Sequence, residues 1–467
     1  EGLKAADAVV EGEYGVPVIC HQCLESHGMV AEWNKEQTEL TVWASTQATV
    51  GVAGAIRSRF KLAPNAVNVI THYMGGGFGS KFQPYPEGYA ACELAKETGK
   101  AVKIMLTREA EITTAGNRPS AYGKVKISGK KDGSITSFEI NVHGTPGDGS
   151  RSSTVGPLPY VYELPNYVAT RTSVRVNAGS QRAMRAPGHP QSCFLMESAI
   201  DDLAAKLDIN PLKIRMKHLP ENDAESVKND PTSFAALRGT IYRKELEIAT
   251  KLAQWDKKWH KPGADKGVMK HGIGMALHTW SGRAAPQPNE ATVLITRDGS
   301  ITVQTSTQDL GTAQRTVSAI VAAELFGLKP TDINVLIGES KYGLSTGSGG
   351  STTCPSQAPA TLRAATEARA QFLAKIAGRI GSKAEDLTLA NGKLIDGKRK
   401  KEWSWKQAAA KLGMDQIKGT GSWTFFESVK EKGVSSSGVG GVQIAEVLVD
   451  TETGRVCCKK KVAVKNS

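Results

Sequence analysis

The sequence contains no apolar run long enough to cross a lipid bilayer, so an ordinary membrane-spanning helix is excluded. It also opens without the charged-then-apolar pattern of a secretory signal segment. We therefore expect no membrane span and a cytoplasmic location, with the periplasm as the alternative. Because the first residue is Glu1 and not methionine, we expect a processed, cleaved or partial chain.

Cysteine is also scarce, with seven residues in a chain of 467. An odd number in a large chain argues against a disulfide framework. One group, Cys20-His21-Gln22-Cys23 with His27 nearby, has a spacing seen among metal ligands. No second Cys/His pair follows at zinc spacing, so a structural zinc ion is not expected.

Charge is modest, and its excess is basic: 59 Lys and Arg against 46 Asp and Glu give a net charge of +13. The basic residues are spread along the chain without a recognition-helix, zinc-finger or aromatic RNA-binding pattern. We therefore expect no nucleic-acid partner and interpret the charge as solvated surface. An anionic cofactor or an acidic partner subunit is the alternative.

Glycine is abundant, and three consecutive glycines open the segment Gly75-Gly76-Gly77-Phe78-Gly79-Ser80-Lys81. The segment lies between an extended run and a helical pattern. Without Cβ atoms its backbone can adopt positive φ and bring N–H groups to an anionic or strongly polar ligand. The spacing fits neither a P-loop nor a dinucleotide fingerprint. A tight turn without a ligand is the alternative.

Two more segments in the first half combine a turn with polar residues. Thr46-Gln47 follows an extended run and precedes a helical pattern, a position at which polar side chains can contact a ligand. The alternative is that Thr46 only caps the helix. Arg185 is fixed by a Pro-Gly turn before a strong helix. An arginine held in this way suits a carboxylate, carbonyl or phosphate group, unless it pairs with an acid elsewhere in the chain.

The second half has two comparable segments. Residues 307–313 precede a predicted helix at Gln314–Phe326, whose N-terminus can bind an anion. Residues 347–356, rich in glycine and hydroxyl side chains, precede a predicted helix at Ala360–Ala377. Such a loop can cradle a polar cofactor, and a flexible linker is the alternative.

A chain of this length predicts two or more domains. The turn Asp-Gly-Ser-Ile-Thr occurs at 132–136 and again at 298–302, each time between alternating runs, which indicates two similarly built halves. Residues 255–271 are basic and contain a Pro-Gly turn, so they form the predicted linker. The predicted domains are therefore 1–254 and 272–467, each mixed in helix and strand, in an α+β fold.

The glycine segment resembles Gly-Gly-Gly-Phe-Gly-Gly-Lys of the molybdenum-binding subunit of the xanthine oxidase family, which includes aldehyde oxidoreductases. Further segments resemble the family in the same order along nearly the whole chain, through His21, Leu24, Glu25, His27, Thr46, Gln47, Arg182, Arg185, Gly188, Pro190, Gln191, Gln443, Glu446 and Asp450. The resemblance implies two domains that enclose a molybdopterin-type molybdenum cofactor, with a cytosine dinucleotide form as one variant. The pterin dithiolene would hold the metal, so no direct protein ligand is expected.

The resemblance also implies the site residues. Gln47, which would hydrogen-bond an oxo ligand, and Arg185 are the implied catalytic residues, and Phe78 and Phe82 line the implied substrate pocket. The implied cofactor-binding residues are Gln47, Gly76, Gly77, Phe78, Gly79, Arg185, Gly311, Thr312, Gly350, Ser351, Thr353 and Ser356. Purine-oxidising members have a glutamate where this chain has Phe82, which argues against xanthine and favours an aldehyde or an apolar aromatic substrate.

In the family, a glutamate in a Gly-x-Gly-Glu segment acts as general base, and that segment does not occur in this sequence. An iron–sulfur cysteine pattern is also missing. We therefore expect a small-molecule hydroxylase or dehydrogenase that uses water as its oxygen source and is active only in a complex. The expected partners are a 2Fe-2S subunit, an FAD subunit and a polypeptide that supplies the glutamate. A non-catalytic cofactor-binding scaffold and a glycine-rich nucleotide-binding enzyme are the alternatives.

Overall fold

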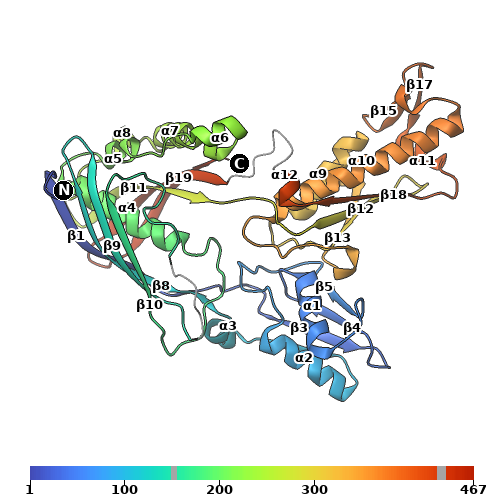
Figure 1. Ribbon diagram of the computed structural model, residues 1–467, viewed down its shortest axis with the longest axis horizontal. Coiled ribbons are helices and arrows are strands. Elements are labelled where there is room, and N and C mark those ends of the chain that lie inside the picture. Colours follow the sequence, from blue (N-terminus) through green and yellow to red (C-terminus); the bar gives the residue numbers. More distant parts are fainter. Residues whose placement is uncertain (149–154, 429–437, 467) are drawn as a thin grey trace. The chain divides into compact units, whose positions relative to one another are not determined.

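The computed structural model describes residues 1–148, 155–428 and 438–466, which form two compact units that alternate along the chain (Figure 1). Unit 1 contains residues 1–20, 116–282 and the described part of 432–467. Unit 2 contains residues 21–115 and the described part of 283–431, and therefore holds the predicted glycine segment. Within the described residues, no helix has the length and apolar character needed to cross a membrane.

Unit 1 is built on a four-stranded sheet of order β1-β8-β9-β10 and a three-stranded sheet of order β11-β19-β20, with the short pair β2-β7. The strands are β1 (Ala8–Val16), β2 (Ile19–Cys20), β7 (Asn117–Arg118), β8 (Ser120–Gly129), β9 (Ile135–Thr145), β10 (Tyr167–Ser173), β11 (Met269–Trp280), β19 (Val439–Asp450) and β20 (Val456–Lys465). The helices are α4 (His189–Lys206), α5 (Pro211–Lys217), α6 (Ala224–Asn229), α7 (Phe234–Ala253) and α8 (Trp255–Lys258).

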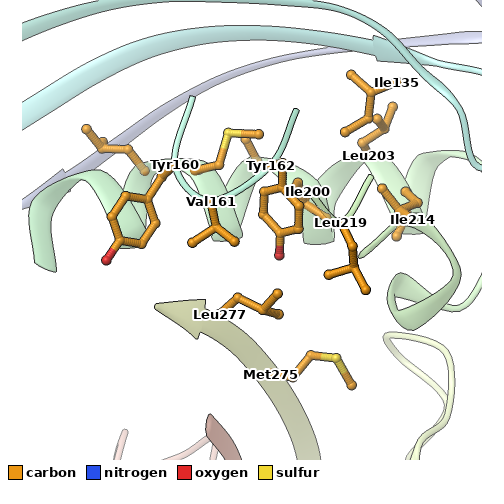
Figure 2. Packing of buried hydrophobic residues seen from close by; sticks show 14 of the residues in the cluster. Ile135, Tyr160, Val161, Tyr162, Ile200, Leu203, Ile214, Leu219, Met275 and Leu277 are labelled. Atoms are coloured by element: carbon orange, nitrogen blue, oxygen red, sulfur yellow. The ribbon is translucent and has the colours of Figure 1, made fainter. Parts of the chain in front are cut away.

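The core of unit 1 lies where α4 packs against these sheets (Figure 2). Leu195, Ala199 and Leu203 recur at helical spacing on α4 and are fully buried, so the apolar stripe of the helix faces the core. The segment Tyr160–Tyr162 and the β11 residue Leu277 complete the cluster.

Unit 2 contains two four-stranded sheets and a small three-stranded one, β15-β16-β17. The strands are β3 (Gly28–Trp33), β4 (Leu40–Ala44), β5 (Val67–Ile70), β6 (Val102–Met105), β12 (Asn289–Ile295), β13 (Ile301–Thr305), β14 (Ile333–Ile337), β15 (Leu387–Ala390), β16 (Lys393–Asp396), β17 (Lys401–Ser404) and β18 (Ile417–Trp423). The helices are α1 (Thr49–Phe60), α2 (Tyr85–Thr98), α3 (Arg108–Thr114), α9 (Gln314–Phe326), α10 (Thr353–Ile380), α11 (Trp405–Ala410) and α12 (Phe425–Ser428), with 3-10 turns η1 (Pro330–Asp332), η2 (Ser340–Tyr342) and η3 (Ala384–Asp386).

One strand pattern recurs in three sheets. In β6-β3-β4-β5, β18-β12-β13-β14 and β1-β8-β9-β10, two antiparallel pairings are followed by a parallel one. Inside unit 2 the parallel strand is reached through a helix, α1 in one sheet and α9 in the other (Figure 1). The repeated Asp-Gly-Ser turns close the β8–β9 and β12–β13 hairpins, where Asp132 and Asp298 accept the N–H of the serine two residues on. The predicted mixed α and β class is confirmed.

The helix α10 begins earlier than the sequence predicts. It starts at Thr353 and not at Ala360, so Thr353 and Ser356 lie in its first turn and not in a loop. Pro355 is tolerated there because a first-turn residue needs no N–H acceptor.

The predicted linker 255–271 also contains regular structure. It begins with α8, whose Trp255 is buried, and it ends in β11. Where the domain boundary lies stays a prediction.

Candidate functional site

The segment Gly75–Lys81 forms a turn between β5 and α2, called here the glycine turn. Gly76 and Gly79 have φ of +91° and +112°, which disfavour residues with a Cβ. At Gly77 a Cβ would lie 2.5 Å from Oε1 of Gln47, so only glycine fits. Phe78 also adopts a left-handed φ of +53°, and its ring is 42% exposed. The turn thus holds an aromatic ring outward on a strained backbone.

The carbonyl oxygens of the glycine turn are largely engaged within unit 2. Gly75 O accepts from Glu25 N (3.2 Å), Gly76 O from Lys81 Nζ (2.8 Å), Gly77 O from Ser80 N (2.9 Å), Ser80 O from His27 Nε2 (3.2 Å) and Lys81 O from Gln47 N (2.9 Å). The turn therefore has few acceptor atoms left to offer a ligand.

The N–H group of Ser80 donates to Gly77 O, and the other N–H groups of the turn divide into two sets. Those of Gly75, Gly79 and Lys81 donate to side chains, the first to Glu25 and the other two to Oε1 of Gln47. Those of Gly76, Gly77 and Phe78 donate to no atom of the described residues. Three consecutive N–H donors beside satisfied carbonyls are suited to an anionic or oxo group.

Gln47 connects the glycine turn to a second loop of unit 2. Its side chain is buried, and its Nε2 donates to Ser348 O at 2.8 Å while its Oε1 accepts from the turn. The backbone O of Gln47 also accepts from Ser348 N at 2.7 Å. A carboxamide nitrogen has two protons, so one remains beyond the contact with Ser348.

Phe82 packs against the same second loop. A Cβ at Gly347 or Gly349 would lie 2.9 Å or 2.4 Å from the Phe82 ring, so the loop backbone lies directly against the ring. Unit 2 therefore brings the glycine turn, Gln47, Phe82 and residues 347–349 together. Whether Phe82 lines a substrate pocket stays a prediction.

The N-terminus of α9 is already occupied by a carboxylate of the chain itself. Asp309 accepts from Gly311 N (2.9 Å) and Thr312 N (3.0 Å) through Oδ1, and from Arg315 N (3.1 Å) through Oδ2. These three N–H groups are therefore used within the chain, and whether this helix end also binds an external anion stays a prediction. Gly311 and Thr312 are exposed, and their contact with a pterin stays a prediction.

The residues predicted around the start of α10 differ in exposure. Ser356 is fully buried, and its Oγ accepts from Ala285 N at 2.8 Å, so the hydroxyl already has one partner. Gly350 and Ser351 are exposed and both have positive φ, while Thr353 is partly buried. Their predicted roles in cofactor binding are not tested by these contacts.

Arg185 belongs to unit 1, where it is exposed and precedes α4. Its carbonyl oxygen accepts from Nη2 of the buried Arg118 at 2.6 Å, and Ala186 O accepts from Nη1 at 3.3 Å. The backbone of Arg185 is therefore fixed by a second arginine that no sequence motif indicated. The catalytic role of Arg185 stays a prediction.

Two buried titratable side chains lie against the glycine turn, and their partners could not be predicted from local patterns. Lys81, 1% exposed, donates to Gly76 O, to Glu25 O (2.7 Å) and to Ser45 Oγ (2.7 Å). Its three ammonium protons are thereby used inside the protein, so Lys81 is not a free cation for a ligand. Burial lowers the pKa of Lys81, an effect that the neighbouring Cys23, Glu25 and Glu111 oppose.

Beside Lys81, the buried His27 faces Glu111 of α3, with Nδ1 at 2.9 Å from the carboxylate. Glu111 also accepts from His27 N at 2.9 Å. A helix residue more than eighty positions away supplies this partner, so local patterns could not indicate it. Within the described residues, no cluster of three or more His, Cys, Asp or Glu is arranged to hold a metal ion.

Comparison with known families covers most of the chain. Residues 1–219 and residues 248–466 each match a family described as a molybdopterin cofactor-binding domain. The xanthine dehydrogenase molybdenum-binding subunit of Escherichia coli O157:H7 is 28% identical over 412 residues, which is 86% of this chain and 54% of that protein. The aldehyde oxidoreductase molybdenum-binding subunit PaoC of E. coli K12 is 27% identical over 97% of this chain and 61% of its own length. The chain thus spans about half the length of the curated relatives it matches.

Solved structures share the fold. Quinoline 2-oxidoreductase from Pseudomonas putida 86 superimposes with a TM-score of 0.81 at 19% identity, covering 99% of this chain and 62% of that one. The aldehyde oxidoreductase from Desulfovibrio gigas superimposes with a TM-score of 0.74 at 22% identity, covering 100% of this chain and 50% of that one. With two molybdopterin cofactor-binding domains across its length, the chain belongs to the family of molybdenum-binding subunits of xanthine dehydrogenases and aldehyde oxidoreductases.

Proposed function

We propose that this chain binds a molybdopterin-type molybdenum cofactor at the glycine turn and takes part in oxidising an aldehyde or an aromatic heterocycle. Water would supply the oxygen atom, and electrons would pass to iron–sulfur and flavin partners. The observation that carries the proposal is the set of N–H groups at Gly76, Gly77 and Phe78 that have no acceptor in the part of the chain that the structure describes.

The geometry of the glycine turn fits an electron-rich group. Its carbonyls are engaged from within unit 2, so the ligand meets donors and little that repels negative charge. Gln47 adds the second carboxamide proton beside the same turn. These donors are backbone groups and a buried side chain, and both keep their direction when a ligand binds.

When bound, the cofactor supplies the two-electron redox chemistry for hydroxylation. The chain's own residues orient it: the turn binds the electron-rich face, and Gln47 holds the turn to residues 347–349. Hydroxylation also needs a base within hydrogen-bond reach of the attacking group, roughly 2.6–3.2 Å. We propose that a glutamate of a Gly-x-Gly-Glu segment, which these 467 residues do not contain, supplies it.

The proposed substrate class follows from two aromatic residues. Phe78 exposes its ring at the glycine turn, where it can contact an apolar substrate. Phe82 has no polar group to bind the edge of a purine, so a purine would lose a hydrogen-bond partner there. An aldehyde or an apolar aromatic heterocycle needs no hydrogen-bond partner at this position, so Phe82 does not disfavour it.

The partner proposal rests on the relatives, whose names describe them as molybdenum-binding subunits. We propose an iron–sulfur subunit that carries 2Fe-2S clusters and a subunit that carries FAD. A cytosine dinucleotide form of the pterin is part of the same proposal.

The test is to purify the chain with its native partners and measure molybdenum and pterin per chain. Turnover of aromatic aldehydes, quinoline-type heterocycles and hypoxanthine is then assayed with a dye acceptor. We expect about one molybdenum per chain and turnover of the first two classes. Bound molybdenum without turnover of any substrate indicates a scaffold, and bound nucleotide without molybdenum contradicts the proposal.

A further inference from the structure

The backbone of the glycine turn is held from behind by a buried ammonium group. Lys81 ends the turn, and its side chain folds back so that Nζ donates to Gly76 O five residues earlier. The other two protons go to Glu25 O and Ser45 Oγ, which lie outside the turn. Lys81 thus ties the first half of the turn to two neighbouring segments of unit 2.

A second buried group holds the other half of the turn. His27 directs Nε2 at Ser80 O (3.2 Å) and Nδ1 at both oxygens of Glu111 (2.9 Å). The buried ring thus joins the Ser80 carbonyl to the side chain of Glu111 on α3. The hydrogen-bond partners of Lys81 are carbonyl and hydroxyl oxygens, whereas His27 faces a carboxyl group.

These contacts decide which side of each peptide faces a ligand. A peptide whose carbonyl points toward Lys81 directs the N–H of the next residue the opposite way, because the peptide is planar and trans. The Gly76 carbonyl faces Lys81, so the Gly77 N–H is directed away from it. If this peptide flipped, its carbonyl would point where its N–H now points and would repel an anionic or oxo group.

We propose that Lys81 is a positioning residue that fixes the peptide orientation of the glycine turn, so that its N–H groups, and not its carbonyls, meet the cofactor. This inference rests on the proposed function for the identity of the ligand. Lys81 does not touch the ligand itself, since its three protons are used within the protein. His27 and Glu111 support the same orientation at Ser80.

The test compares Lys81→Met with two matched variants in the purified complex. Lys100→Met removes an exposed lysine of the same unit, and Ile56→Val loosens the buried core on α1 without touching the turn. Molybdenum and pterin per chain, the melting temperature and hydrogen exchange of residues 75–81 in cofactor-free protein are measured for each. Lys81→Arg, which keeps the charge and the donors, serves as the conservative variant.

We expect Lys81→Met to bind the cofactor at least about tenfold more weakly and to exchange faster at the hydrogen-bonded amides of Gly75, Gly79, Ser80 and Lys81, because the turn loses the donor that holds Gly76 O. Lys100→Met should match the natural protein, and Ile56→Val should lower the melting temperature but keep its cofactor. Lys81→Arg should recover part of the binding. Unchanged exchange and unchanged cofactor content in Lys81→Met would overturn the inference.

Two other outcomes separate the inference from the proposed function. Equal cofactor loss in Ile56→Val at the same melting temperature shows that Lys81 acts through stability alone, and this also overturns the inference. If the natural protein holds no molybdopterin, the proposed function fails. The exchange comparison in cofactor-free protein then still decides whether Lys81 fixes the turn.

Discussion

Arg215 of unit 1 and Lys81 of unit 2 are the most deeply buried cations that each unit shows among the described residues, and they have different partners. Arg215 of unit 1 is 0% exposed and binds side chains: Nε donates to Glu197 at 2.8 Å and Nη1 to Asp201 at 2.7 Å. Lys81 of unit 2 is 1% exposed and binds two backbone carbonyls and one hydroxyl.

The partners show what each buried charge does. Arg215 joins α5 to α4 through carboxylates, and Tyr162 completes the group by donating to Glu197. These contacts hold α5 against α4, and the Arg215 guanidinium donates to carboxylates of the chain and not to a ligand. Lys81 instead holds the backbone of a turn in which the N–H groups of Gly76, Gly77 and Phe78 have no acceptor among the described residues. The Arg215 ion pair thus serves the fold, and we propose that Lys81 serves the site.

Arg215→Met gives the largest expected effect. It leaves Glu197 buried without its cation, and breaking a buried ion pair costs about 3–5 kcal/mol. We expect urea unfolding to show this loss in the free energy of unfolding. The double variant Arg215→Met/Glu197→Gln should recover part of it, and a single variant within 1 kcal/mol of the natural protein would show that Arg215 is not needed for stability.

Gln47→Ala tests the proposed cofactor site in unit 2. The variant removes the acceptor for Gly79 N and Lys81 N and the donor beside the turn. Loss of a donor of this type lowers turnover by about 10²–10³. The assay is turnover per bound molybdenum, with the exposed Gln416→Ala as the control. Normal turnover at full molybdenum occupancy in Gln47→Ala argues against the role.

Local patterns were enough to locate the glycine turn, because a run of glycines between a strand and a helix has few other uses. Helix α9 begins and ends where the sequence predicts, and Gly327 ends it in a left-handed conformation. The start of α10 was missed because its first turn contains hydroxyl residues and a proline that resemble a loop.

The supporting charges of the site could not be predicted in this way. The partner of His27 comes from α3. Asp309 accepts from Gly311 N, Thr312 N and Arg315 N only when the loop before α9 is folded around its carboxylate. Lys81 turns inward although it follows a motif that suggests an anion-binding cation. These features depend on tertiary packing, which residue spacing along the chain does not encode.

Another buried charge, Glu245 on α7, extends the comparison because its carboxyl accepts no hydrogen bond of normal geometry from the described residues. Burial raises its pKa to about 7, and the nearby Asn466 backbone offsets this only in part. Between about pH 5 and 8 the folded state holds more protons than the unfolded state, so this group lowers stability as pH rises. We expect a change of about 1–3 kcal/mol.

Glu245→Gln removes this titration. The variant should therefore show a flatter stability profile over the same pH range, measured by urea unfolding at several pH values. The exposed Glu247→Gln is the control, and its profile should follow that of the natural protein. An equally steep profile in Glu245→Gln would assign the pH dependence to other groups.

Phe78 gives the smallest expected effect on stability. Phe78→Gly relieves a left-handed φ of +53°, and the gain is offset by the greater freedom of glycine in the unfolded chain. The net change should stay within about 1 kcal/mol, whereas Phe78→Ala should be about 1 kcal/mol less stable than Phe78→Gly. Thermal unfolding measures both. Equal stabilities would show that the backbone of the turn is not strained.

The most direct measurement is residue-resolved hydrogen exchange of the glycine turn with and without bound cofactor. The account predicts that the amides of Gly76, Gly77 and Phe78 exchange freely in cofactor-free protein and become protected on binding. The amide of Gly79, which already donates to Gln47, should change less. Unchanged exchange at Gly76, Gly77 and Phe78 at full molybdenum occupancy would contradict the claim that this turn binds the cofactor.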